Sequence, residues 1–124
     1  MNLNQLTIYT TRPVDTVDFY RTLGLRLIVD SLPRYARLEC PDGESTLSVH
    51  ESDSDQASGI VLYFECEELD PVVDDLKSVG IVFEQDPVDQ PWLWREAYTR
   101  DPAGNRICLY HAGKNRKDPP WKII

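Results

Sequence analysis

The sequence places two side chains that could do chemistry two positions apart, Ser48 and His50, near the end of a strand-like segment. Side chains alternate along a strand, so both are expected on one face. His50 could act as a general base, donate a hydrogen bond to a ligand or replace a metal ligand. The structural alternative is a partly buried histidine satisfied by a neighbour. His50 is the one catalytic candidate of the chain.

A second chemically distinctive segment contains Trp92, Trp94 and Arg95. Two indoles on one face of a strand could stack a planar ligand, and the guanidinium could bind its anionic group. The alternative is a core strand or a dimer-interface strand. Cys108 and Tyr110 are spaced like Ser48 and His50. Because no histidine neighbours Cys108 in the sequence, a buried thiol is expected there rather than a nucleophile.

Two helices and eight strands are expected to position these residues. Apolar residues recur at helical spacing in two segments, Val14 to Leu23 and Val72 to Val79, and Gly24 and Gly80 end the two helices. The expected strands span residues 3–10, 25–29, 33–40, 45–51, 59–66, 81–84, 92–100 and 106–111.

The order of elements repeats. Arg34-x-Ala36-x4-Pro41-x-Gly43 recurs 61 residues later, from Arg95 to Gly104. This internal repeat predicts two tandem βαβββ modules. We expect one domain over 1–124, consisting of module 1 (1–52), a connector (53–58), module 2 (59–111) and a C-terminal tail (112–124).

Composition narrows the classes of function. The chain has 124 residues and a net charge of −8, with a net charge of +3 on the tail and −11 on the rest. Such an acidic body repels phosphate backbones, so no nucleic-acid partner is expected. No apolar run approaches the ~20 residues of a membrane span, and the N-terminus lacks a signal-peptide pattern. Three widely spaced cysteines fit reduced thiols, so we expect a cytoplasmic protein without membrane contact.

The chain resembles the vicinal oxygen chelate superfamily, which contains glyoxalases, bleomycin-resistance proteins and extradiol dioxygenases. The resemblance spans about residues 3–111 and is carried by three segments, 18–25, 76–81 and 101–107, the last reading Asp-Pro-Ala-Gly-Asn-Arg-Ile. It implies an α+β fold in which two βαβββ modules form an open, cup-shaped, eight-stranded mixed sheet with helices on the outer face. It also implies a homodimer.

Metal-dependent members of that superfamily place His, Gln or Glu ligands in the first and last strands of each module. The resemblance puts Gln5, Ser48, Ile60 and Cys108 at these positions. Ile60 has no donor atom, neutral Ser48 is a weak ligand, and Cys108 offers soft sulfur. We therefore expect no metal or other cofactor, and a divalent metal held with the help of His50 is the alternative.

The sequence thus predicts a protein that binds a small organic molecule in the cup without the usual metal site. The expected ligand-binding residues are Gln5, Ser48, His50, Trp92, Trp94, Arg95, Cys108 and Tyr110. The alternative is a lyase or isomerase acting on a small oxygenated metabolite, with His50 as general base and Arg95 or a metal stabilising an enolate. A dioxygenase is less expected, because its iron needs two histidines and a carboxylate. An interaction module without a ligand is a third alternative.

Overall fold

The computed structural model describes residues 1–57 and 59–123 and divides into two compact units. Unit 1 comprises Met1–Gly59 together with Asp101–Asn105, and unit 2 comprises Ile60–Arg100 and Arg106–Ile124. Ser58, the last residue of the predicted connector, and Ile124, the end of the predicted tail, lie outside the described residues.

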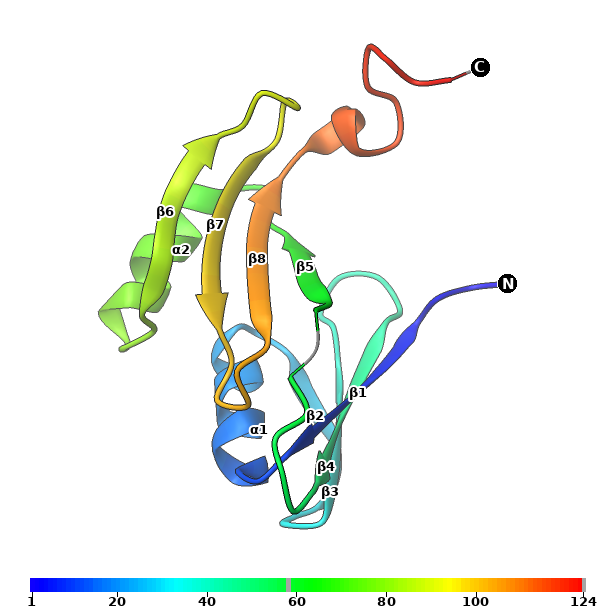
Figure 1. Cartoon of the computed structure of the whole chain (residues 1–124), viewed down its shortest axis with the longest axis vertical. Coiled ribbons are helices and arrows are strands. Elements are labelled where there is room, and N and C mark those ends of the chain that lie inside the picture. Colours follow the sequence, from blue (N-terminus) through cyan, green and yellow to red (C-terminus); the bar gives the residue numbers. More distant parts are fainter. Residues whose placement is uncertain (58, 124) are drawn as a thin grey trace. The chain divides into compact units, whose positions relative to one another are not determined.

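Unit 1 is a βαβββ module (Figure 1). Its elements are β1 (Gln5–Thr10), α1 (Pro13–Thr22), β2 (Arg26–Ser31), β3 (Tyr35–Glu39) and β4 (Thr46–Glu51). The four strands form one mixed sheet in the order β1-β4-β3-β2, with β1 parallel to β4 and the other pairs antiparallel.

Unit 2 repeats this arrangement. Its elements are β5 (Val61–Glu65), α2 (Leu69–Ser78), β6 (Phe83–Asp89), β7 (Arg95–Arg100), β8 (Arg106–His111) and a short 3₁₀ helix, η1 (Gly113–Arg116). The strand order is β5-β8-β7-β6, again with one parallel pair, β5 and β8. The predicted α+β fold with two βαβββ modules is therefore confirmed, and its eight strands form two four-stranded mixed sheets.

The glycines that the sequence indicated as helix ends directly follow the C-cap residues of the two helices, Leu23 and Val79. Gly24 has φ +109° and Gly80 has φ +99°, a left-handed conformation that glycine adopts without steric cost. Beyond the C-cap residue Leu23 of α1, the backbone N–H groups of Gly24 and Leu25 donate to carbonyls of the last turn. Gly80 and Ile81 do the same for α2. Each helix thereby turns directly into the next segment of its module.

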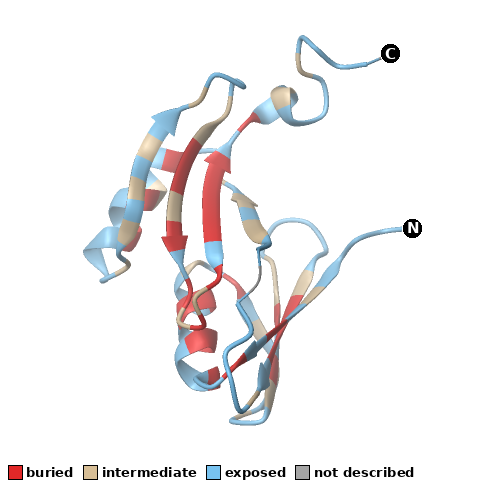
Figure 2. Ribbon diagram, viewed as in Figure 1, coloured by how far each residue is buried: buried red, intermediate tan, exposed pale blue. Residues whose placement is uncertain are grey.

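Alternation along the strands separates two faces in each sheet. In unit 1, α1 packs on β3 and β4, and Leu47 and Val49 are buried (Figure 2). Ser48 and His50 therefore lie on the face opposite Leu47 and Val49. In unit 2, Glu96 and Tyr98 on β7 pair with Tyr110 and Cys108 on β8 and share a face with them. These faces carry the candidate site residues.

Most expected strand boundaries were wrong by one or two residues, and those of β6 and β7 by up to five. β6 runs from Phe83 to Asp89 instead of ending at residue 84, because an edge strand tolerates Pro87. β7 starts at Arg95 instead of residue 92, because the preceding residues form a turn in which the N–H of Leu93, with φ +68°, donates to the Gln90 carbonyl. β5 starts at Val61 instead of residue 59. Within the described residues, no helix is long and apolar enough to cross a membrane.

Candidate functional site

A chain of hydrogen bonds crosses the open face of the unit 1 sheet. The Gln5 Nε2 amide donates to Ser48 Oγ at 2.8 Å, and Ser48 Oγ lies 2.7 Å from the Tyr35 hydroxyl. Arg37 Nε donates to the same hydroxyl at 3.0 Å. Ser48 is only 1% exposed beneath these side chains. The Ser48 and Arg37 hydrogen bonds lower the pKa of Tyr35, and that of Ser48 contributes most.

His50 lies beside this network, between two aromatic rings. Strand pairing puts Tyr9 of β1 and Tyr35 of β3 on either side of it, and each ring centroid is 5.5 Å from the imidazole. The imidazole is exposed. In the part of the chain that the structure describes, no carboxylate lies within ion-pair distance of His50. The arrangement presents an accessible imidazole without the carboxylate that often orients a catalytic histidine.

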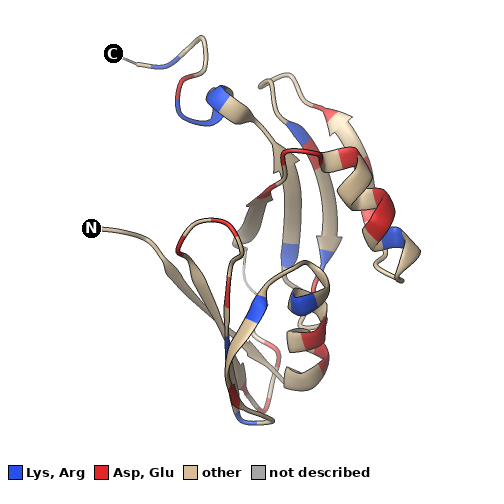
Figure 3. Ribbon diagram, turned by 180° about the vertical axis from the view of Figure 1, so that it is seen from behind, with Lys and Arg blue, Asp and Glu red and all other residues tan. Residues whose placement is uncertain are grey.

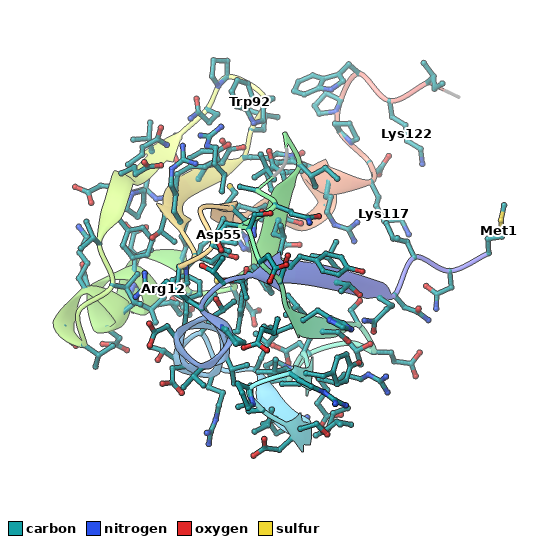
Figure 4. All side chains as sticks on the ribbon, turned by 60° about the horizontal axis from the view of Figure 1, so that its bottom comes forward. Met1, Arg12, Asp55, Trp92, Lys117 and Lys122 are labelled. Atoms are coloured by element: carbon teal, nitrogen blue, oxygen red, sulfur yellow. The ribbon has the colours of Figure 1, made fainter. Side chains whose placement is uncertain are left out.

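The open face of unit 2 is built around a buried carboxylate. Glu96 is 2% exposed. Its Oε2 accepts a hydrogen bond from the Trp92 indole N–H at 2.9 Å, and its Oε1 accepts one from the Tyr98 hydroxyl at 3.1 Å. Trp92 belongs to the turn between β6 and β7 (Figure 4). Both donors are neutral, so they satisfy the carboxylate oxygens without compensating their charge.

Aromatic side chains lie next to this carboxylate. Trp94 stacks on Tyr110, with ring centroids 4.7 Å apart and planes at 17°. Tyr63 of β5 meets both rings edge-on, at 5.5 Å from Tyr110 and 6.0 Å from Trp94. The Trp94 indole N–H donates to the Asn115 carbonyl at 3.3 Å, which ties the tail to this face. We call Tyr63, Trp92, Trp94, Glu96 and Tyr110 the aromatic face.

Cys108 lies under the aromatic face, paired across the strands with Tyr63 and Tyr98. Its side chain is fully buried. Burial is the main cause that raises the pKa of the thiol to about 12, and the Glu96 charge adds to it. Both nucleophilic attack and metal ligation require the thiolate, which this environment disfavours at neutral pH. The thiol therefore has a packing role, as the sequence suggested.

Arg95 lies apart from the aromatic face. Strand alternation turns it away from Glu96, toward α2, where two guanidinium nitrogens donate to the two Asp70 oxygens, each at 2.9 Å. A third nitrogen donates to Asp89 at 3.0 Å. Asp70 is one of several acidic residues along α2 (Figure 3). The sequence left open whether Arg95 binds a ligand or pairs with nearby acidic residues. The structure shows the pairing with acidic residues.

Comparison with known protein families identifies the family to which this fold belongs. A sequence model of the Glyoxalase/Bleomycin resistance protein/Dioxygenase superfamily matches residues 2–109. The chain belongs to this superfamily. The resemblance drawn from its motifs is thereby confirmed. No curated protein gives a significant match to the chain.

Solved structures of the same superfamily share the fold. A glyoxalase/bleomycin resistance protein/dioxygenase from Nocardioides superposes with a TM-score of 0.79 at 21% identity, over 100% of this chain and 90% of that chain. Lactoylglutathione lyase from Agrobacterium tumefaciens gives 0.73 at 18% identity, covering 94% and 96%. TioX from Micromonospora sp. ML1 gives 0.71 at 18% identity, covering 90% and 99%. At these identities the likeness establishes the fold alone.

The positions that the resemblance equates with the superfamily's metal ligands hold mostly poor donors in this chain. Strand pairing matches Gln5 with Thr46 in unit 1 and Val61 with Arg106 in unit 2, so Val61 is the register equivalent of Gln5, and Ile60 lies just before β5. Neither Val61 nor Ile60 has a side-chain donor. In residues 1–57 and 59–123, no three His, Cys, Asp or Glu side chains are grouped closely enough to hold a metal ion. The donor set does not fit the divalent metal of the superfamily.

Sequence reasoning missed Glu96 and its unit 1 equivalent, Tyr35. The two residues are 61 positions apart, which is the offset of the internal repeat. Glu96 lies opposite Tyr110 in the sheet of unit 2, and Tyr35 lies opposite His50 in the sheet of unit 1. Strand alternation was the available signal. Arg95 and Glu96 are neighbours and must point to opposite faces, so only one of them can join Tyr110.

Proposed function

We propose that this chain is a superfamily member that binds a small organic molecule on the aromatic face of unit 2 and does so without a metal ion. The observation that carries the proposal is the aromatic face itself, a buried carboxylate beside stacked and edge-on rings. Sites for small molecules combine aromatic surface with a few placed polar groups. Tyr63 and Trp92 are exposed and offer ring surface to a ligand.

The chemistry of the donor set supports the metal-free part of the proposal. The buried Cys108 thiol is held protonated by its raised pKa, and Ser48 is already engaged by Gln5 and Tyr35. A hard divalent ion prefers carboxylate, imidazole or water oxygen over such groups. Metal analysis of protein purified without chelator is expected to find less than a tenth of an equivalent of any divalent metal. A stoichiometric metal would contradict this part.

Ligand binding is tested by calorimetric titration with two probes of the same shape, 1-naphthylmethylamine and 1-naphthylmethanol. At least one of them is expected to bind, and Trp94→Leu is expected to weaken that binding about tenfold, because it removes the stack on Tyr110. Trp121→Leu is the matched control, since Trp121 is 58% exposed in the tail. Equal effects of the two substitutions, or no binding of either probe, would contradict the proposal.

The lyase or isomerase alternative rests on the accessible His50 imidazole beside the polar network of unit 1. Arg37 donates a hydrogen bond to Tyr35 in this network, whereas Arg95 pairs with Asp70 in unit 2. In this alternative, Arg37 therefore takes the enolate-stabilising role that the sequence suggested for Arg95. An imidazole in this position can remove a proton next to a substrate carbonyl. Nuclear magnetic resonance of small hydroxy ketones in deuterated water would show exchange of that proton, and His50→Ala is expected to abolish it. Unchanged exchange in the variant removes His50 from this role.

A further inference from the structure

We propose that Glu96 is a recognition site for the protonated amine of the ligand, and that Trp92 covers this site when the ligand is absent. This inference rests on the proposed function and specifies the ligand as an aromatic molecule with a cationic nitrogen. The starting observation is the contrast between the burial of Glu96, at 2% exposed, and the neutrality of its partners, Trp92 and Tyr98.

A buried carboxylate without a cation is an unusual arrangement. Removing a charge from water is costly unless an opposite charge or strong hydrogen bonds compensate it. None of the ion pairs among the described residues includes Glu96. Two cations near this face have other partners. The Arg106 guanidinium lies over the Tyr98 ring, 4.4 Å from its centroid. Arg116 pairs with Glu65 at 3.7 Å, and Glu65 also accepts N–H groups of the tail. A positively charged ligand nitrogen would supply the missing charge.

The rings around Glu96 favour the same ligand. Ring faces attract cations through their quadrupole, and Trp and Tyr do so most strongly. Trp92 hydrogen-bonds the carboxylate, Tyr63 is exposed, and Trp94 stacks on Tyr110 beside them. A ligand with an aromatic part and an ammonium group can therefore lie against the rings while its nitrogen meets the carboxylate. A neutral or anionic ligand gains only the first of these contacts.

Access to Glu96 requires Trp92 to move. Its indole N–H occupies Oε2, and its side chain is 45% exposed. It belongs to the turn before β7 rather than to a strand, so no strand pairing holds its backbone. A protonated amine donates to a carboxylate as the indole does and adds a full charge. Displacement of the indole by the amine thus exchanges a neutral hydrogen bond for a charged one.

The experiment compares 1-naphthylmethylamine with 1-naphthylmethanol by calorimetric titration at low ionic strength. The two probes differ only in an ammonium and a hydroxyl group. The full-length protein is expected to bind the amine at least tenfold more tightly than the alcohol. Glu96→Gln is expected to reduce this preference to below threefold, because it removes the charge and keeps the shape. Glu67→Gln, an exposed residue with the same change of charge, is expected to keep the preference.

A second variant tests the cover. Trp92→Phe removes the N–H donor and keeps an aromatic ring, so the amine no longer competes with the indole and is expected to bind about threefold more tightly. Weaker binding of the amine to this variant would overturn the role of Trp92 as a cover. Equal binding of amine and alcohol to the unmodified protein, or an unchanged preference in Glu96→Gln, would overturn the role of Glu96 and leave small-molecule binding intact. If neither probe binds, the proposed function fails, and this inference fails with it.

Discussion

The hydrogen bond between Tyr20 and Asp101 is expected to be a major contributor to the stability of unit 1. Tyr20 lies on α1, whereas Asp101 starts the turn between β7 and β8, a segment that belongs to unit 1. The two side chains are 0% and 4% exposed, and the Tyr20 hydroxyl donates to Asp101 Oδ2 at 2.6 Å. Burial and the Asp101 carboxylate both raise the pKa of Tyr20, so this phenol stays protonated and remains a donor.

Tyr20→Phe removes this donor and leaves the ring in place. Asp101 keeps three hydrogen bonds, from the backbone N–H groups of Ala103 and Asn105 and from the Asn105 side chain, so the turn itself is retained. A hydrogen bond to a charged group contributes about 1.5–3 kcal/mol. We expect the free energy of unfolding to fall by about 2 kcal/mol, which corresponds to roughly 6–8 °C in melting temperature for a chain of this size.

Urea denaturation followed by circular dichroism measures this difference, and Tyr9→Phe is the matched control. Tyr9 is exposed, so its change is expected to stay within about 0.5 kcal/mol. In an Asp101→Asn background, Tyr20→Phe is expected to cost at least about 1 kcal/mol less, because the charged acceptor is gone. The reasoning would be refuted if Tyr20→Phe left the free energy of unfolding unchanged. It would also be refuted if Tyr20→Phe lowered the free energy of unfolding as much in the Asp101→Asn background as in the unmodified protein.

Three further predictions concern groups with shifted pKa values. Because burial raises the pKa of Cys108 to about 12, native protein at pH 8 is expected to resist alkylation there, and mass spectrometry should find the residue labelled only after denaturation. Ser48→Ala is expected to raise the pKa of Tyr35, because the hydrogen bond between these two residues is the main cause that lowers it. The chemical shifts of the Tyr35 ring carbons, followed against pH, measure this pKa. An unchanged pKa in the variant would contradict the prediction. Burial raises the pKa of Glu65, but the hydrogen bonds from the tail N–H groups outweigh burial, so the pKa is lowered overall. The stability that this contact contributes is therefore fully present above the ordinary glutamate pKa of about 4.3. It is lost as the pH falls through the lower pKa of the folded protein. The protection factor of the Gly113 amide against hydrogen exchange, which corrects for the pH dependence of exchange itself, should therefore fall in acid, and a protection factor that stays constant as Glu65 is protonated would contradict this.

Local signals in the sequence were sufficient for the order of elements and for the repeat. Helical spacing and the two helix-ending glycines depend only on neighbouring residues, and β8 has the bounds that its pattern predicts. The turn before β7 was missed for a different reason. Trp92 and Trp94 alternate with other residues as a strand does, and only the hydrogen bonds that Gln90 exchanges with Leu93 and Trp94 exclude a strand there.

The partners of the site residues depend on contacts between distant segments. Arg95 meets Asp70 across 25 residues, and Trp94 meets Asn115 across 21. No spacing rule predicts such pairs, because they arise from strand register and from the position of a helix over the sheet. The hydrogen-bond network of unit 1 is easier to predict, because its members lie on neighbouring strands. Once β3 and β4 are paired, register places Tyr35 opposite His50 and Arg37 opposite Ser48.

The duplicated fold preserves positions while the chemistry at those positions differs. Four equivalent pairs lie on the open faces of the two sheets: Tyr35 and Glu96, Arg37 and Tyr98, Ser48 and Cys108, and His50 and Tyr110. In unit 1 three of the four residues join one hydrogen-bond chain, and a cation, Arg37, ends it. In unit 2 the arginine is replaced by a tyrosine, so the carboxylate at the first position has neutral partners only. Function therefore depends on the residues at these positions rather than on the fold, and in our proposal the uncompensated Glu96 charge is the feature that selects a cationic ligand.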